Sequence, residues 1–302
     1  MTQEMNPERL EVDAPLVRRL VAAQFPAWAD LPVRPVEVSG WDNRTFRLGE
    51  TMSVRLPSAA GYVPQIEKEH RWLPILAPKL PLPVPVPLAK GAPGEGYPFV
   101  WSVYGWLDGE TAAEGRTDNL NEFAVSLADF LTALQRVDPA GGPPPGLHSA
   151  FRGGPLSTYD PETRRTLVTL EDEIDAEAAT AVWEEALEAT WQGGDSWFHG
   201  DVAAGNLLVQ EGRLVGVIDF GCAGVGDPAC DLAVAWTLLE GRSREVFRAG
   251  LGLDDAAWAR GRGWALWKAL ITLAEFLPTD PASANDARRV IAEISTDFRR
   301  NR

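Results

Sequence analysis

The sequence predicts an α+β protein in which a small antiparallel sheet with a helix precedes a larger, mainly helical part. Two strand-like runs, residues 45–48 and 52–56, are separated by a polar turn and indicate a meander near the N-terminus. Beyond residue 107, apolar residues recur mostly at helical spacing. A hairpin pattern at residues 207–218 is embedded in that helical part. Strands grouped in one part of a chain and helices in another are typical of the α+β class.

The composition is that of a globular protein with an acidic surface. The chain has 302 residues, of which 45% are hydrophobic and 24% charged, which is enough for a substantial core and for one or two domains. Its formal net charge of −15 argues against a nucleic-acid partner and suits a cationic small molecule. Plain solubility explains the same charge at least as well.

The N-terminal residues and the cysteines lead us to expect a cytoplasmic protein. The chain begins without a basic segment followed by an apolar run, and no segment offers about twenty uninterrupted apolar residues, so we expect neither an export signal nor a membrane span. Cys222 and Cys230 lack the paired Cys/His spacing of a zinc site and fit a reducing compartment.

The first part of the chain alternates helices with extended segments. We expect a helix from about Ala14, then the meander, and then a second helix from about Pro64. Residues 80–88 alternate proline with apolar residues, which excludes a helix and favours an extended path. Residues 97–104 are interpreted as a buried strand that ends at Gly105.

The second part is expected to contain a long helix at residues 120–134, two acidic helices between residues 160 and 191, and a last helical region rich in tryptophan. The glycine- and proline-rich residues 141–146 form a loop within this part. The acids of the two helices either grip an amine of a substrate or form a solvated face, which is the more common role. They are Glu171, Asp172, Glu173, Asp175, Glu177, Glu184, Glu185 and Glu188.

The hairpin at residues 207–218 is expected to bring two metal ligands together. Because its arms fold back on each other, Asn206 before the first arm and Asp219 after the second should meet, since cross-strand neighbours lie about 4.5 to 5.5 Å apart. An amide oxygen and a carboxylate suit one hard cation such as Mg²⁺. Asp201, left free of that pair, can orient a nucleophile.

This stretch resembles the catalytic motifs of the aminoglycoside phosphotransferase family, whose fold is that of a protein kinase. Residues 199–201 match the family's His-Gly-Asp, Asn206 follows at the family's spacing of five, and residues 218–221 match its Ile-Asp-Phe-Gly. Residues 226–233 continue the family pattern. The triplet alone is weak, but the combination is specific, and the resemblance covers most of the chain.

The resemblance implies a bilobal enzyme with an N-lobe at residues 1–103 and a C-lobe at residues 104–302. ATP or GTP would bind in the cleft with Mg²⁺, which Asn206 and Asp219 would hold, and the γ-phosphoryl group would pass to a hydroxyl of a small molecule. Asp201 would orient that hydroxyl and accept its proton late.

The family places a phosphate-binding lysine on the third strand, where this chain has Arg55. Arginine keeps the charge and forms a bidentate fork, so either Arg55 does the same work or nucleotide binding is weaker. We expect Glu69 in the second helix to pair with Arg55, and a solvated helix acid is the alternative. Lys68 is not expected to replace Arg55, because it belongs to a helix.

The resemblance also assigns nucleotide contacts at two other places. Asn43 lies at the turn that would cover the phosphates, and a plain hairpin connection is an equal alternative. Backbone groups of Ser102 and Val103 would bind the adenine, with Trp101 in its pocket, although core packing is the commoner role for any one of these side chains.

Supporting roles fall to residues around the motif and near the C-terminus. By the same resemblance, His199 and Asp231 support the catalytic loop, and helix capping by Asp231 would use the same geometry. Glu275, in the last helical region, is a tentative substrate contact.

The acceptor and the oligomeric state are left open by the sequence. The acidic charge favours a cationic antibiotic of the aminoglycoside kind or an aminosugar, and a primary metabolite such as choline or homoserine is the alternative. A catalytically silent nucleotide-binding module is a reading from another class, supported only by the departure at Arg55. A metal-dependent phosphoesterase is a further one, and it would need more histidines than the three in this chain.

Overall fold

The structure is a computed structural model that describes residues 10–36, 40 and 42–300. The chain divides into two compact units. The first comprises Met1–Gly109 together with Gly216–Gly221, and the second comprises Glu110–Val215 and Cys222–Arg302. The segment that carries Asp219 therefore belongs to the first unit, although the chain reaches it from the second.

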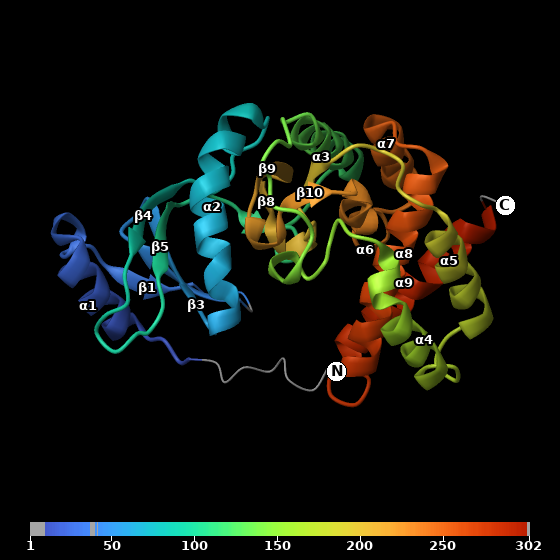
Figure 1. The fold of residues 1–302 in the computed structure, drawn as a ribbon, viewed down its shortest axis with the longest axis horizontal. Helices are drawn as coiled ribbons and strands as arrows, with labels where there is room; N and C mark the ends of the chain where they lie inside the picture. The colour runs from blue at the N-terminus through green and yellow to red at the C-terminus, as the bar shows by residue number, and fades with distance from the viewer. Residues whose placement is uncertain (1–9, 37–39, 41, 301–302) are drawn as a thin grey trace. The chain divides into compact units, whose positions relative to one another are not determined.

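The first unit is built on an antiparallel sheet of five strands in the order β1-β2-β3-β5-β4 (Figure 1). Strand β5 therefore lies between β3 and β4 and has no free edge. The expected meander is confirmed as β2 and β3. The strands are β1 (Val33–Pro35), β2 (Asn43–Leu48), β3 (Met52–Pro57), β4 (Pro87–Gly91) and β5 (Trp101–Gly105).

Two helices pack on this sheet. Helix α1 (Ala14–Gln24) begins at the N-cap Asp13 and packs its buried face, which includes Leu20, against Val54 and other apolar side chains of the sheet. Helix α2 (Val63–Leu76) contacts the polar side chains of the sheet. Because side chains alternate between the faces of a strand, β3 and β5 each send one row to α1 and the other to α2.

The expected strand at residues 97–104 begins later than predicted, at Trp101. Tyr97 instead closes a tight turn with Gly94, with backbone hydrogen bonds in both directions and positive φ at Glu95 (52°) and Gly96 (88°). Pro98 then follows, and proline cannot donate to a ladder. The turn and the proline therefore delay the start of the strand, which the apolar pattern had placed at Tyr97.

The second unit is mainly helical, as expected. Helix α8 is buried along most of its length and packs against α4, α5 and α9 (Figure 1). The long helix at residues 120–134, the two acidic helices and the tryptophan-rich region are all confirmed. The helices are α3 (Leu120–Gln135), α4 (Asp160–Thr169), α5 (Ala176–Glu188), α6 (Val234–Thr237), α7 (Gly241–Leu251), α8 (Asp255–Phe276) and α9 (Pro281–Arg300).

The predicted hairpin is formed by β8 (Leu207–Gln210) and β9 (Arg213–Val217), with β6 (Glu110–Thr111) on the other side of β8. Glu211 and Gly212 both have positive φ, 50° and 74°, as a two-residue type I′ turn requires. A second ribbon pairs β7 (Ser196–Phe198) with β10 (Gly224–Gly226) and flanks the loop that follows β7. Across the described residues, no helix is both long enough and apolar enough to cross a membrane.

Candidate active site

The loop that follows β7 is held by the buried carboxylate of Asp231, which accepts two of its backbone hydrogen bonds. Asp231 is 1% exposed and lies in a short 3-10 helix, Pro228–Ala233. The backbone N–H of His199 donates to its Oδ2 at 2.8 Å, and the N–H of Gly200 donates to its Oδ1 at 2.7 Å. Burial raises the pKa of Asp231, and the two backbone hydrogen bonds counteract part of that shift. These contacts fit the supporting role expected of Asp231.

Gly200 is required by the close packing of this loop. Its φ is +84°, and a Cβ built on it would lie 2.8 Å from the carbonyl oxygen of Cys222. A side chain at this position would therefore be strained and would displace the backbone after Asp219. This explains why glycine stands where protein kinases have arginine.

Asp201 is fixed by its own neighbours in the second unit. Its N–H donates to Nδ1 of His199 at 3.2 Å, so this ring nitrogen acts as the acceptor. The amide nitrogen of Asn206 donates to the carbonyl oxygen of Asp201 at 2.9 Å and to its Oδ2 at 3.0 Å. The expectation that Asp201 is left free of Asn206 is therefore wrong, because Asn206 orients the carboxylate.

Loss of the Asp231 carboxylate should loosen this loop. Asp231→Ala leaves two buried N–H groups without their acceptor, and each costs about 1–3 kcal/mol of stability. Asp231→Asn retains one acceptor oxygen and removes a costly buried charge, so we expect it to lose less. Urea unfolding of both variants checks this. An alanine variant as stable as the wild-type protein would contradict the supporting role.

In the first unit, Arg55 of β3 bridges two carboxylates. Its Nη1 lies 3.4 Å from Oε1 of Glu69, and its Nη2 lies 3.2 Å from Oδ1 of Asp219. The hydroxyl of Tyr104 donates to the other oxygen of Glu69. Burial lowers the pKa of Arg55, but Glu69 and Asp219 together outweigh it and raise the pKa above its ordinary value. The pairing of Arg55 with Glu69 is thus present in the structure.

Asp219 has an unusual backbone conformation and an accessible carboxylate. Its φ of +64° is a left-handed conformation that non-glycine residues rarely adopt and that clusters at functional sites. Its side chain is 33% exposed, and the N–H of Gly221 donates to Oδ1 at 3.4 Å. Oxygen donors such as this carboxylate suit Mg²⁺, and the expectation that Asp219 and Asn206 meet and hold this ion stays a prediction. Among the described residues, no cluster of three or more His, Cys, Asp or Glu side chains suits a metal ion.

The comparisons with known proteins identify the family. A family model described as the phosphotransferase enzyme family (APH) matches residues 32–264. The chain belongs to this family.

Curated relatives of the chain are matched over about half of their length. The uncharacterized protein YcbJ of Bacillus subtilis (strain 168) is 28% identical over 190 residues, 59% of this chain and 55% of that protein. An aminoglycoside 3'-phosphotransferase of Escherichia coli is 30% identical over 146 residues, 46% of this chain and 52% of that protein.

Solved structures of the phosphotransferase family share the fold over nearly the whole chain. The GDP complex of aminoglycoside 2'-phosphotransferase-IIIa matches with a TM-score of 0.69 and 17% identity, covering 95% of this chain and all of that one. The macrolide 2'-phosphotransferase MphH from Brachybacterium faecium matches with a TM-score of 0.61 and 23% identity, covering 92% and 97%. At these identities the likeness establishes the kinase-like α+β fold that the motifs implied.

The structure contradicts the adenine contacts expected from the phosphotransferase resemblance. Ser102 and Val103 lie in β5, where they are paired with β3 on one side and with β4 on the other. Their backbone groups are therefore engaged in the sheet. Trp101 is fully buried on the α1 face of the sheet, with its ring 5.5 Å from that of Phe25 and its N–H on the carbonyl of Ala92. It fills the core and not a nucleotide pocket.

Asn43 is the first residue of β2, paired with Pro57, and is 7% exposed. Part of the turn before it, residues 37–39 and 41, lies outside the described residues. Sequence reasoning missed a contact beside it: Asp42 accepts a hydrogen bond of 2.9 Å from the side chain of Gln65 in α2. The phosphate-covering role of Asn43 stays a prediction.

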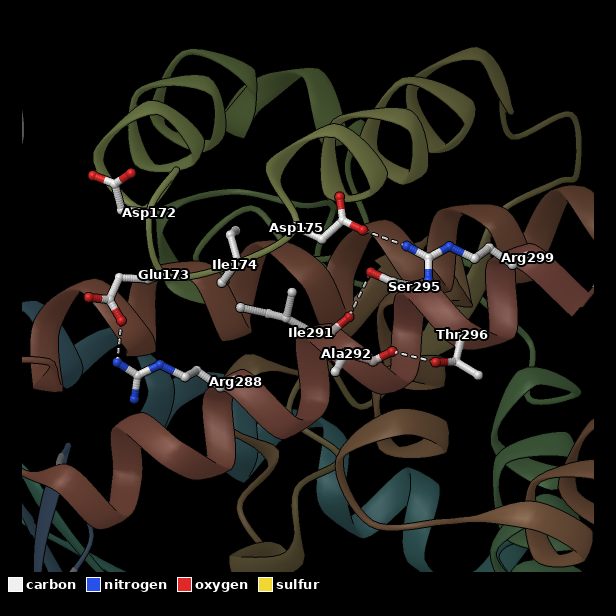
Figure 2. A pocket seen from close by; sticks show the side chains of 10 residues that line it. All are labelled: Asp172, Glu173, Ile174, Asp175, Arg288, Ile291, Ala292, Ser295, Thr296 and Arg299. Atoms are coloured by element: carbon white, nitrogen blue, oxygen red, sulfur yellow. Dashed lines mark hydrogen bonds and ion pairs between the residues drawn. The ribbon is translucent and has the colours of Figure 1, made fainter.

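Four of the eight acids predicted between residues 171 and 188 form ion pairs with arginine: Glu173, Asp175, Glu184 and Glu185. A hollow of about 500 Å³ lies between the loop after α4 and helix α9. Figure 2 shows the side chains that line it, with ion pairs at both of its ends. Glu173 pairs there with Arg288, and Asp175 lies 2.5 Å from Arg299. These pairs leave little negative charge in the hollow to attract an amine, which weakens the expectation that these acids grip the substrate.

Glu275 is exposed near the C-terminal end of α8. Its role as a substrate contact stays a prediction.

Proposed function

We propose that this chain is a nucleotide-dependent phosphotransferase that moves the γ-phosphoryl group of ATP or GTP to a hydroxyl of a small molecule. The observation that carries the proposal is Arg55, held between Glu69 and the strained Asp219. A fixed guanidinium beside a metal-binding carboxylate is what a triphosphate needs, because positioning and charge stabilisation dominate phosphoryl transfer. Within the second unit, the carboxylate of Asp201 is oriented by the amide of Asn206, which suits a group that positions an acceptor hydroxyl.

The roles of the other residues follow from their contacts. Asp219 and Asn206 would hold Mg²⁺, which would neutralise phosphate charge when bound. Arg55 would hold phosphate oxygens with its planar fork in place of the usual lysine. Asp201 would orient the acceptor hydroxyl and take its proton late in the reaction.

The acceptor class is the least constrained part of the proposal. We retain a cationic antibiotic or an aminosugar, on the strength of the net charge of −15, and keep a metabolite such as choline or homoserine as the alternative. The similar structures include a macrolide phosphotransferase, and Glu173 and Asp175 in Figure 2 are ion-paired, so acceptors with little positive charge belong in any screen.

The two readings from other classes are disfavoured. His199 is fully buried, and its Nδ1 accepts the N–H of Asp201, which is not the arrangement of a phosphoesterase metal ligand. A silent nucleotide-binding module rests on the departure at Arg55, yet Arg55 occupies an ion-paired position beside Asp219.

The proposal is tested by nucleoside diphosphate release from the purified protein with ATP or GTP and Mg²⁺. The panel contains aminoglycosides, macrolides, aminosugars and amino alcohols, and Asp201→Ala serves as the inactive control. We expect one acceptor class to stimulate release in the wild-type protein and not in the variant. Tight nucleotide binding without stimulation by any acceptor would favour the silent module, and the absence of nucleotide binding would overturn the proposal.

A further inference from the structure

Helix α2 contacts three separate segments around Asp219 within the first unit. Gln65 donates to Asp42, which precedes β2, at 2.9 Å. Glu69 pairs with Arg55 of β3. Between these two positions, Lys68 donates from its Nζ to the carbonyl oxygen of Gly221 at 2.5 Å. Lys68, which was not expected to take part because it belongs to a helix, thus reaches the loop that carries Asp219.

Gly221 links Lys68 to the carboxylate of Asp219 through its two backbone groups. Its carbonyl accepts from Lys68, and its N–H donates to Oδ1 of Asp219 at 3.4 Å. A side chain at this position would crowd both α2 and the carboxylate, since a Cβ built on the glycine would lie 3.0 Å from the side-chain carbon Cδ of Gln65 and 3.1 Å from Oδ1 of Asp219. Lys68 therefore holds the short backbone segment that faces the carboxylate.

Asp219 needs such support for two reasons. Its left-handed backbone persists only where the surroundings hold it, because the conformation is strained for a residue with a Cβ. The guanidinium of Arg55 also attracts Oδ1 of Asp219. The carboxylate would therefore rotate toward Arg55 if the backbone were loose. A long lysine stem that is half-buried along α2 supplies a charged donor at the required point.

We propose that Lys68 is a positioning residue for the metal ligand: by holding Gly221 it keeps Asp219 in the orientation that binds a divalent cation together with the nucleotide phosphates. The inference rests on the proposed function and adds to it a residue outside the family motif. It implies that Lys68 affects the binding affinity for the metal and not only that for the nucleotide. Groups that orient a ligating carboxylate typically change metal affinity about 10- to 100-fold.

The test measures ADP binding by calorimetry with and without Mg²⁺, in the wild-type protein and in Lys68→Met, Lys68→Arg and Lys90→Met. Lys90 is the matched control, because it also pairs with α2, through Glu67 at 2.6 Å, on an exposed face. We expect Lys68→Met to lose about 10-fold or more of the gain in affinity that Mg²⁺ provides, while its Mg²⁺-free affinity changes little. Lys68→Arg keeps a charged donor and should recover part of the gain, and Lys90→Met should behave as wild type.

Three outcomes would overturn the inference. One is an unchanged Mg²⁺-dependent gain in Lys68→Met. Another is an equal loss with and without Mg²⁺, which would indicate direct phosphate binding or general destabilisation, and thermal unfolding separates these two. The third is a wild-type protein whose ADP binding ignores Mg²⁺, which would refute the metal in the proposed function itself. If Lys68→Met does not fold, Lys68→Arg against the wild type decides, since its longer, planar guanidinium cannot reproduce the close contact of the ammonium with Gly221 and must lower the Mg²⁺-dependent gain and leave the Mg²⁺-free affinity unchanged.

Discussion

Asp201→Ala is expected to reduce phosphoryl transfer by about 10²- to 10⁴-fold, the range that a positioned general base contributes. The carboxylate is oriented by the amide of Asn206 and by the loop that Asp231 holds, so its removal deletes the group that positions the acceptor hydroxyl. Arg55 and Glu69, which we propose act in nucleotide binding, belong to the other unit, and their ion pair should be unaffected. We therefore expect a lower kcat with nearly unchanged affinity for ADP and Mg²⁺.

Steady-state kinetics with the acceptor found in the screen, combined with ADP binding, measures this split. Asp172→Ala is the matched control, because it removes an exposed carboxylate at the edge of the hollow in Figure 2, away from residues 199–206 in sequence. A variant of Asp201 that turns over at the wild-type rate would refute the mechanism. A variant that loses nucleotide binding as well as turnover would show that Asp201 acts on the fold and not on the hydroxyl.

The features that the sequence predicted well depend on local signals. The hairpin at residues 207–218 follows from two apolar runs around a Glu-Gly turn, and helices α1 and α3 begin at the side chains of Asp13 and Asn119, which accept from their first turns. The motif residues around Asp201 are recognisable because their spacing is short. The α+β class follows from the order of such local elements.

The incorrect nucleotide contacts depended on strand order, which is not a local property. The residues around Ser102 read as a strand, but whether that strand lies at the edge or the centre of the sheet depends on distant partners, which for Ser102 are Lys90, 12 positions away, and Arg55, 47 positions away. The register that pairs Arg55 with Ser102 also sends Trp101 to the opposite face. The division of the lobes after residue 103 stays a prediction for the same reason.

Long-range side-chain contacts were likewise beyond the sequence. Helical spacing shows that Gln65, Lys68 and Glu69 lie near one another on α2, but it does not show which segment they meet. Contacts to Asp42 and Gly221 bring together residues separated by 23 and 153 positions. The ion pairs of the acidic residues could not be predicted either, since only the fold reveals that Glu173 and Asp175 lie beside arginines of α9.

Asp219→Asn should have the other large effect, and a different signature from Asp201→Ala. The amide keeps the size and the Oδ1 acceptor for Gly221 but removes the charge that we propose binds the metal, and with it half of the carboxylate charge that faces Arg55. Charge stabilisation by a bound metal contributes several kcal/mol, so we expect turnover to fall on the order of 10²-fold or more. Unlike the change at Asp201, this one should abolish the Mg²⁺-dependent gain in ADP affinity.

Asp195→Asn, a surface change in the second unit, is the control. Retention of that gain in Asp219→Asn would mean that another residue binds the metal and that the strained backbone at Asp219 serves only the ion pair with Arg55.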